Sequence, residues 1–340
     1  MEEKIKIYVP ESISSILLKD MELFEFYKKD HTLNRNDFYN TLVMNYYETY
    51  QADNSDIYEH IKAVVAENSG REDYEDSDIA DRILRYIESR TNHLEGPKAE
   101  VTLSMKPTKS SRRAIGYIQD CLLRNSTLSS YFRNLFASYV LLPQDKRERI
   151  IFREKFEVIE EAIANDRKIY FTTSANEAPH IVSPYSLSSS KEELFNYLLA
   201  EYNGKAYSFR ITRLKKVVMM AETSSISAEN EKIFRKMEKY GPQFSYAGNT
   251  ADEEIRVRMS DRGKEMYEKI YIHRPVLKRI EGDVYVFDCS QNQAYQYFIR
   301  FGRNAVVEAP KSLQDDIVRY YSSSLRAYRK NREENNENTL

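Results

Sequence analysis

Polar and hydrophobic residues alternate with a period of two in two stretches of the first half of the chain. Residues 4–9 read Lys-Ile-Lys-Ile-Tyr-Val and residues 100–106 read Glu-Val-Thr-Leu-Ser-Met-Lys, a pattern typical of strands with one buried face. A proline closes each strand, and two segments with apolar residues at helical spacing follow each proline. The pattern predicts a tandem repeat of strand, helix and helix over residues 4–50 and 99–142.

The segments that adjoin these copies are strongly charged. Residues 51–97 hold twelve acidic and five basic residues, and we interpret them as a solvated acidic connector with an exposed turn over 69–76 between two short helices. Residues 143–165 are predicted to form a charged linker helix. The final residues, 329–340, are rich in Asn and Glu, and we expect a disordered tail there.

The last third of the chain changes repeatedly between strand and helix periodicity. The predicted strands cover residues 255–259, 283–289 and 305–310, and the predicted helices run from 261 to about 271, over 291–301 and through 313–328. Together with the first half, this order predicts an α+β protein. A chain of 340 residues is long enough for two or three such domains.

The composition and charge of the chain limit which cellular environment and which binding surfaces we expect. Hydrophobic residues make up 41% of the chain and charged residues 31%, and the formal net charge is −2, so any nucleic-acid surface is a local patch. Cys121 and Cys289 lie in apolar patterns, which predicts two buried free thiols in a reducing cytoplasm. We find neither a signal peptide nor an apolar run long enough for a membrane span, and we expect a cytoplasmic protein without membrane contact. The 27 tyrosines suit stacking on unpaired bases, although AT-rich coding bias is the simpler explanation.

The outward faces of the two predicted strands carry polar side chains. This strand-helix-helix unit resembles the ribbon-helix-helix family, in which two strands pair into an antiparallel ribbon that enters the major groove. The resemblance leaves open whether the ribbon forms within one chain or between two. The alternative is a helical scaffold with solvated strand faces. The candidate nucleic-acid-binding residues of the ribbon are Lys4, Lys6, Tyr8, Arg35, Thr102, Ser104 and Lys106.

Residues 155–225 contain a second set of motifs. Residues 181–187 read Ile-Val-Ser-Pro-Tyr-Ser-Leu, residues 196–198 read Asn-Tyr-Leu and residues 207–214 read Tyr-Ser-Phe-Arg-Ile-Thr-Arg-Leu. In order and spacing they resemble a WYL domain, with Asn196 in place of the Trp. The resemblance implies a small Sm-like β-barrel that binds a ligand, often nucleic acid, through Tyr and Arg. The matching positions are Tyr170, Tyr185, Tyr197, Arg210 and Arg213.

Basic residues surround these motifs. Lys205 and Lys215 belong to a stretch, residues 205–216, with five basic residues and no acidic one, interleaved with aromatic residues. Basic side chains anchor phosphates and aromatic rings stack on bases, so we add both lysines to the candidate RNA or ligand site. The alternative is a solvated basic strand.

Residues 253–328 resemble the WCX module that commonly follows WYL domains, which implies dimerisation or ligand sensing. Motifs of enzymes are missing from the sequence: we find no Walker loop, no dinucleotide glycine motif and no His-Glu-x-x-His. The five histidines do not occur at ligand spacing. We therefore expect no enzyme activity, cofactor or metal site.

The layout as a whole resembles the WYL accessory proteins of type VI-D CRISPR systems. That resemblance implies single-stranded RNA and the RNA-guided ribonuclease effector as partners, with stimulation of the effector as the function, and we expect a homodimer. The main alternative is a ligand-responsive transcription regulator in which the ribbon binds operator DNA. A scaffold that only bridges other proteins is a third alternative.

Overall fold

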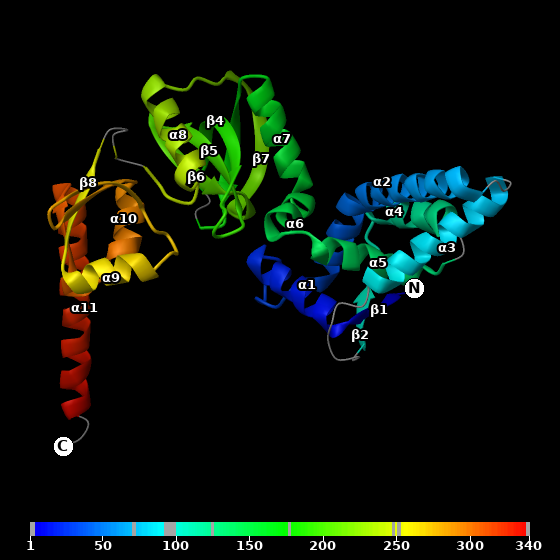
Figure 1. Cartoon of the computed structure of the whole chain (residues 1–340), viewed down its shortest axis with the longest axis horizontal. Coiled ribbons are helices and arrows are strands. Elements are labelled where there is room, and N and C mark those ends of the chain that lie inside the picture. The colour runs from blue at the N-terminus through cyan, green and yellow to red at the C-terminus, as the bar shows by residue number, and fades with distance from the viewer. Residues whose placement is uncertain are drawn as a thin grey trace. The chain divides into compact units, whose positions relative to one another are not determined.

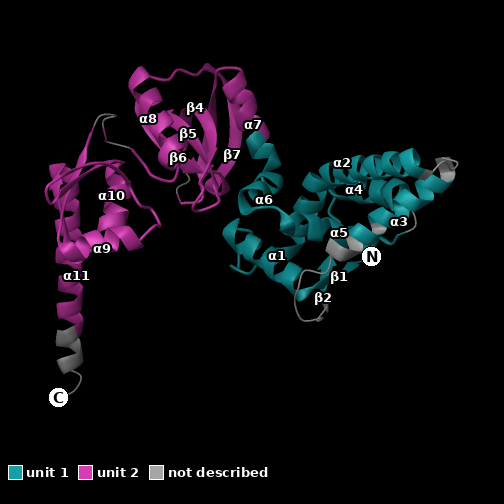
Figure 2. Ribbon diagram, viewed as in Figure 1, with its two compact units in different colours: residues 1–156 teal, residues 157–340 magenta. Residues whose placement is uncertain are grey.

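The chain folds into a mixture of helices and antiparallel sheets (Figure 1), as the α+β prediction requires. It divides into two compact units, residues 1–156 and 157–340 (Figure 2). This computed structural model describes residues 4–69, 73–91, 100–123, 126–175, 178–246, 249 and 253–337.

A two-stranded ribbon opens the first unit. Strand β1 (Ile5–Pro10) pairs antiparallel with β2 (Glu100–Met105) of the same chain, so that Ile7 lies opposite Leu103 and Lys6 opposite Ser104. The predicted alternation is confirmed, because Ile7 and Leu103 are buried while Lys6 and Ser104 are exposed. The question of pairing within or between chains is thereby answered for this structure: the ribbon forms within one chain.

Helices surround the ribbon in the predicted order. The first unit contains α1 (Glu11–Leu23), α2 (Arg35–Ser69), α3 (Asp73–Thr91), α4 (Arg112–Tyr117), a π-helix (Ile118–Leu122), α5 (Leu128–Leu141), α6 (Gln144–Ile151) and the start of α7 (Arg153–Ala164). The Thr127 hydroxyl accepts a hydrogen bond from the Ser130 amide and so caps α5. Each strand is thus followed by two helical segments.

The core of the first unit is aromatic and contains a buried ion pair. The rings of Tyr39 and Phe136 stack at 5.7 Å, and both are almost fully buried. Beside them the Arg147 guanidinium contacts the Asp20 carboxylate at 2.7 Å, and the Tyr139 hydroxyl donates to the same carboxylate at 2.9 Å. Burial raises the pKa of Tyr139 well above its usual value, so the phenol stays a donor at neutral pH.

The single linker helix predicted for residues 143–165 is wrong, because α6 and α7 are separate helices. The break falls at Phe152, whose φ and ψ of −106° and 27° leave the helical region. Its ring packs edge-on against Phe24 at 5.8 Å. The break between the two helices thus falls at a half-buried residue whose ring contacts the buried Phe24.

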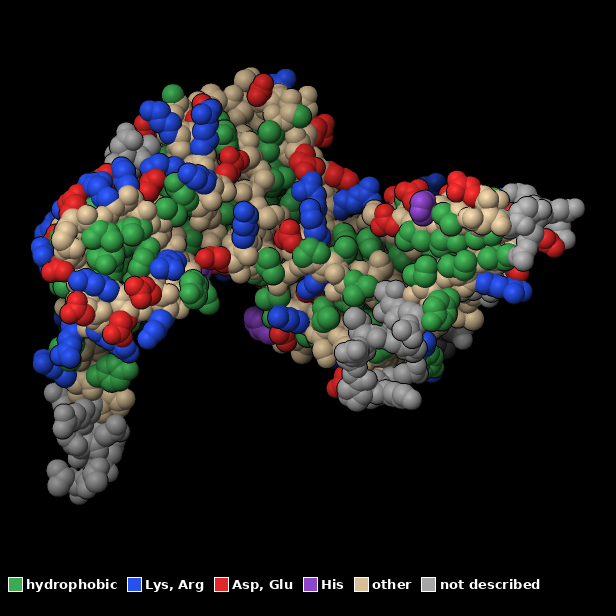
Figure 3. Space-filling view, in the orientation of Figure 1, with side chains coloured by type: hydrophobic (Ala, Val, Ile, Leu, Met, Phe, Trp, Pro, Cys, Tyr) green, Lys and Arg blue, Asp and Glu red, His purple; other side chains and the backbone are tan. Residues whose placement is uncertain are grey.

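The acidic connector is a helical hairpin rather than a pair of short helices. Helix α2 continues without a break to Ser69, and α3 follows after residues 70–72. The predicted turn at 69–76 is too long, since α3 already begins at Asp73, and Asp76 is buried. Hydrophobic side chains lie in rows over α2 and α3 in Figure 3, with acidic side chains along the α2 edge.

After the remainder of α7, the second unit contains a five-stranded antiparallel sheet. Its strands are β3 (Arg167–Thr173), β4 (His180–Ser189), β5 (Asn196–Tyr202), β6 (Lys205–Arg210) and β7 (Leu214–Thr223), hydrogen-bonded in the order β6-β5-β4-β3-β7. Strand β4 pairs first with β3 and then with β5, and its register shifts between Pro184 and Ser186. The predicted closed barrel is not found among the described residues, because β6 and β7 are the edges of this order.

A helix covers one face of this sheet. Helix α8 (Ala228–Tyr240) begins at Ser227, whose hydroxyl accepts from the Asn230 amide. Phe234 and Met237 of α8 pack on Leu199 of β5 and Ala206 of β6. The face that carries Leu199 is therefore closed to large ligands.

A second antiparallel sheet forms the C-terminal part of this unit, with strand order β11-β8-β10-β9. Its elements are β8 (Ile255–Met259), α9 (Asp261–Lys269), β9 (Val276–Glu281), β10 (Val284–Asp288), α10 (Gln291–Phe298), β11 (Ala305–Ala309) and α11 (Lys311–Glu337). Strand β9 was not predicted, because its side chains are largely exposed and show no apolar alternation. Gly263 is required in α9, since a Cβ there would lie 2.1 Å from the carbonyl oxygen of Asn304.

The last helix and the cysteines correct two further predictions. Helix α11 continues to Glu337, so most of the predicted disordered tail is helical; Arg, Lys and Glu are favourable helix formers and extend the packed start of α11. Cys289 is buried as predicted, and burial raises the pKa of its thiol. Cys121 is exposed, because it lies in the π-helix on the side away from the core.

No helix of the described residues is long and apolar enough to cross a membrane.

Candidate nucleic-acid interface

The outward face of the β1–β2 ribbon presents a compact set of polar side chains. Tyr8 lies opposite Thr102 and Lys6 opposite Ser104 in the ladder, and Tyr8 is 41% exposed. The pleat sends these side chains away from the buried face that carries Ile7. Six of the seven predicted ribbon residues share this exposed face, namely Lys4, Lys6, Tyr8, Thr102, Ser104 and Lys106.

The seventh, Arg35, lies at one end of the ribbon, where a hollow of about 740 Å³ opens. Four cations line this hollow, and none of its described lining residues is acidic. The lining residues are Lys4, Lys28, Thr32, Leu33, Arg35, Asn36, Ser104 and Lys106. We call this site the basic hollow.

Backbone hydrogen bonds fix the walls of the basic hollow. The Lys106 amide donates to the Asn36 side chain at 2.7 Å, and the Asn40 side chain donates to the Lys106 carbonyl at 3.1 Å. These bonds join the end of β2 to the first turn of α2. On the other side, the Lys28 amide donates to the Thr32 carbonyl at 2.8 Å. Converging cations of this kind suit the oxygens of a phosphate backbone.

Lys28, Thr32 and Leu33 are the residues of the basic hollow that sequence reasoning missed. The turn between α1 and α2 brings Lys28 back to the ribbon, and nothing in the local pattern marks that return. A nearby acid is also present: Thr32 donates to the Asp30 carboxylate, which lowers the pKa of Asp30. Asp30 thus stays charged at neutral pH and is not among the lining residues.

The structure does not gather the seven predicted residues of the second unit into one open site. Three of them are packed into the protein. The Tyr185 ring stacks on Phe234 at 4.8 Å, and the Arg210 guanidinium lies 3.1 Å from the centre of the Phe195 ring. Tyr197 is buried and donates its hydroxyl to Glu193.

The other four predicted residues are more accessible. Lys205, Arg213 and Lys215 are exposed, and Tyr170 is half-buried on β3. Strand β6 ends at Arg210 and a single 3-10 turn, Ile211–Arg213, follows, so Arg210 and Arg213 do not lie on one continuous strand.

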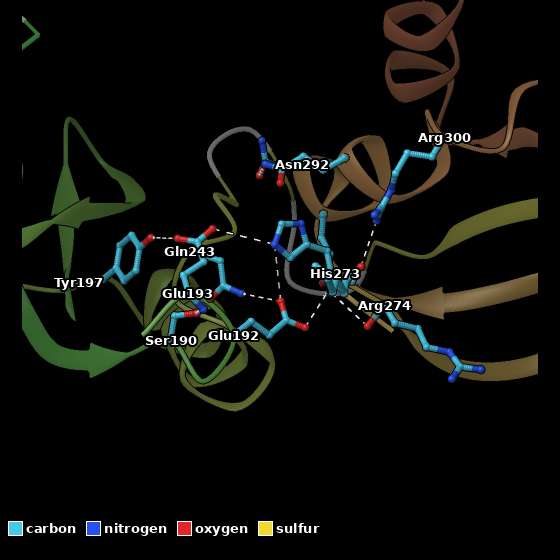
Figure 4. A network of polar contacts seen from close by, with 12 residues as sticks. Ser190, Glu192, Glu193, Tyr197, Gln243, His273, Arg274, Asn292 and Arg300 are labelled. Atoms are coloured by element: carbon cyan, nitrogen blue, oxygen red, sulfur yellow. Dashed lines mark hydrogen bonds and ion pairs between the residues drawn. The ribbon is translucent and has the colours of Figure 1, made fainter. Parts of the chain in front are cut away.

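Tyr197 belongs to a polar network that joins the two sheets of the second unit (Figure 4). Its partner Glu193 lies beside Glu192, which accepts a hydrogen bond from the His273 amide at 3.1 Å. The His273 ring nitrogen Nε2 lies 3.7 Å from the Glu192 carboxylate, and Gln243 donates to Glu192 at 3.3 Å. In this structure Tyr197 therefore helps to hold the two sheets of the second unit together.

Aromatic rings gather on the opposite face of the same sheet. His180 of β4 stacks on Phe171 of β3 at 5.3 Å with an interplanar angle of 2° and lies 5.2 Å from Tyr202 of β5. Tyr207 of β6 lies 5.7 Å from Tyr202, and it stacks on Phe209 at 5.9 Å. Apart from the buried Phe171, these rings are half-exposed. We call these five residues the aromatic end.

A lysine stands beside the aromatic end. Lys205 pairs with Tyr202 across the β5–β6 hairpin and is exposed. Side chains alternate along β6, so Lys205, Tyr207 and Phe209 share one face while Arg210 lies on the other. The alternation of Lys205, Tyr207 and Phe209 was visible in the sequence, whereas His180 and Tyr202 join them only through strand pairing. Half-exposed rings beside a cation can stack on bases and hold a phosphate.

Comparison with known proteins gives a fold but no family. No protein-family profile matches the chain, and no curated protein sequence matches it. Among solved structures, the chain is similar to one described as a CRISPR Cas-related protein, with a TM-score of 0.67 and 21% identity over 97% of this chain and 95% of that chain. Proteasome accessory factor B/C (PafBC) of Arthrobacter aurescens aligns with a TM-score of 0.26 and 14% identity over 67% of this chain and 37% of that chain. The first likeness shows a shared fold, and we draw nothing from the second.

Proposed function

We propose that this chain is a nucleic-acid-binding accessory protein that binds single-stranded RNA and stimulates the RNA-guided ribonuclease effector of a type VI-D CRISPR system. The observation that carries the RNA part is the aromatic end with Lys205 beside it. The CRISPR part is supported by the likeness in fold to a CRISPR Cas-related protein and by the order of ribbon-helix-helix-like, WYL-like and WCX-like segments in the sequence.

The preference for single strands follows from the form of the aromatic end. The half-exposed rings of Tyr202 and Tyr207 offer edges and faces at the end of a sheet. An unpaired base can leave its own stack and lie against such a ring, whereas a base in a duplex is stacked on both faces. Exposed Lys205 and Lys215 supply charge for the backbone. The basic hollow of the first unit provides further phosphate contacts.

We assign the three segments of the resemblance to distinct roles. The WYL-like segment, residues 155–225, provides the surface that contacts the RNA bases. The packed residues Tyr185, Tyr197 and Arg210 stabilise the sheet that carries this surface. The WCX-like segment, residues 253–328, pairs two copies into a homodimer. Sedimentation at tens of micromolar tests this role: a monomer there contradicts it.

The function itself is tested by cleavage and binding assays on purified components. The chain is added to the effector ribonuclease loaded with its guide RNA, and target cleavage is followed with and without it. We expect faster cleavage and nanomolar to micromolar binding of labelled single-stranded RNA. Unchanged cleavage together with no RNA binding contradicts the proposal.

A DNA-binding transcription regulator is a second candidate, favoured by one observation. The ribbon forms within the chain and exposes six polar side chains on one face, a geometry suited to the edges of bases in a major groove. In this case the chain would bind one duplex sequence more tightly than single-stranded RNA at equal salt. Competition between labelled RNA and a pool of random duplexes separates the two candidates.

A further inference from the structure

The hairpin of α2 and α3 exposes apolar side chains that a solvated connector does not need. Ile57 and Val64 of α2 are 42% and 48% exposed, and Ile83 of α3 is 37% exposed. Figure 3 shows hydrophobic side chains running in rows over this hairpin. Contiguous exposed apolar patches on a soluble protein commonly mark sites of protein contact.

The helical period explains how this surface arises. In α2 the buried residues Tyr39, Tyr46 and Tyr50 lie on the core-facing side. At 100° per residue, Ile57 and Val64 follow seven residues apart on that same side, but they lie beyond the last core residue. The helix therefore carries its apolar face past the body of the unit, where α3 covers it only in part.

Helix α3 contributes the other half of the surface. Its buried residues Ala80 and Leu84 are four apart, and Ile83 lies on the same side of the helix. Because only residues 70–72 separate the two helices, α3 must run back along α2 and place its apolar stripe beside that of α2. We call the exposed residues Ile57, Val64 and Ile83 the hairpin seam.

Charge decides what can cover the hairpin seam. Residues 51–97 carry twelve acids and five bases, a net charge of −7, and Asp56, Glu59 and Asp78 are exposed on the hairpin. Nucleic acid is repelled by such a surface. A second copy of the hairpin would bring one acidic surface against another, which costs association energy. A positively charged protein surface with protruding apolar side chains can bury the apolar residues of the hairpin seam and can also pair with the acidic residues around it.

We propose that the hairpin seam is the docking surface for a basic protein, and that this protein is the RNA-binding ribonuclease effector; the identity of the partner rests on the function proposed above. A protein that holds guide and target RNA has a positively charged surface by necessity. The chain would then use opposite charges for its two partners: acids for the effector at the seam, and cations for RNA at the basic hollow and the aromatic end.

The test is direct binding between the full chain and the purified effector loaded with guide RNA, measured by surface plasmon resonance. The double variant Ile57→Lys/Ile83→Lys removes apolar contact and adds like charge, and we expect a loss of affinity of at least about tenfold, as for hot-spot residues. The matched control is Val318→Lys, an exposed apolar residue (57%) on helix α11, which should leave the affinity unchanged. RNA affinity and the melting transition of each variant verify the fold.

A second double variant tests the docking site even if the first one unfolds. Asp56→Asn/Glu59→Gln changes only exposed side chains, and we expect a several-fold weaker complex whose salt dependence is reduced. Undiminished binding by both variants overturns the docking site and leaves the proposed function standing, as does stimulation of cleavage without any direct complex. A change in oligomeric state with unchanged effector binding assigns the seam to a second copy and overturns the inference. If the unaltered chain neither forms a complex with the effector nor stimulates cleavage, both the proposed function and the docking site are overturned.

Discussion

Replacing the two tyrosines of the aromatic end should weaken binding of single-stranded RNA without changing how that binding depends on salt. The double variant Tyr202→Leu/Tyr207→Leu keeps apolar bulk against Phe209 and His180, which lie within 6 Å of these rings. It removes the flat faces and hydroxyl groups that a base would contact. Among the residues that the structure describes, neither phenol makes a hydrogen bond that holds another part of the sheet.

The expected loss is worked from ring geometry. Stacking of one base on one aromatic side chain is worth about 1–3 kcal/mol. The rings of Tyr202 and Tyr207 lie at 70° to each other, so they cannot both lie flat against bases of one continuous stack, and we count one stacked base. Since about 1.4 kcal/mol is a factor of ten, Kd should rise by roughly 5- to 150-fold.

Fluorescence anisotropy with a labelled RNA, titrated at several salt concentrations, measures both quantities. The slope of log K against log salt reflects phosphates neutralised, at about −0.7 for each phosphate on a single strand, and the tyrosine variant should keep that slope. Tyr271→Leu is the matched control, a tyrosine of the same unit that is 71% exposed and lies away from the aromatic end. An equal loss in the control, or no loss in the double variant, refutes the assignment of the site.

Three other predictions address the rest of the molecule. Lys4→Ala/Lys106→Ala in the basic hollow should lower the magnitude of the salt slope by about 1.4, because two phosphate contacts are lost; an unchanged slope shows that RNA does not reach the hollow. Asp20→Asn leaves a buried guanidinium without its carboxylate, and urea denaturation should show a loss of about 3–5 kcal/mol, against no measurable change for Arg235→Gln at an exposed pair. Exposed Cys121 should react with a thiol reagent at neutral pH while the buried cysteine reacts only on unfolding; two fast thiols contradict the described fold.

Local pattern predicted the strands and helices well where one side of an element meets the core. The alternation in residues 4–9 and 100–106 identified β1 and β2 and the correct outward face. The prediction from local pattern failed where no other element buries the apolar residues. The helical hairpin was interpreted as a solvated connector because its many charged residues mask its apolar stripe. The prediction failed again at Phe152, where the backbone leaves the helical region within a segment that the local sequence would continue as one helix.

The predicted site residues of the second unit are spread over different faces of one sheet, and three of them are packed into the protein. The motifs include Tyr197 and Arg210, which the structure packs against Glu193 and Phe195. In this structure these two side chains therefore stabilise the sheet. The partners of Tyr207 in the aromatic end come from strands up to 36 residues away along the chain. Spacing within one strand carries no information about such partners, because strand order decides them.

The pairing of β1 with β2 inside one chain has a consequence for any strand it contacts. A ribbon made by two identical chains must repeat its side chains about a two-fold axis and therefore reads the same in both directions. Here Lys6 faces Ser104 and Tyr8 faces Thr102, so the two edges of the ribbon differ chemically. A polynucleotide lying across the ribbon would meet an unsymmetrical surface, on which its two directions are not equivalent. The two strands are also free to diverge independently, since no symmetry ties a change in one to the same change in the other.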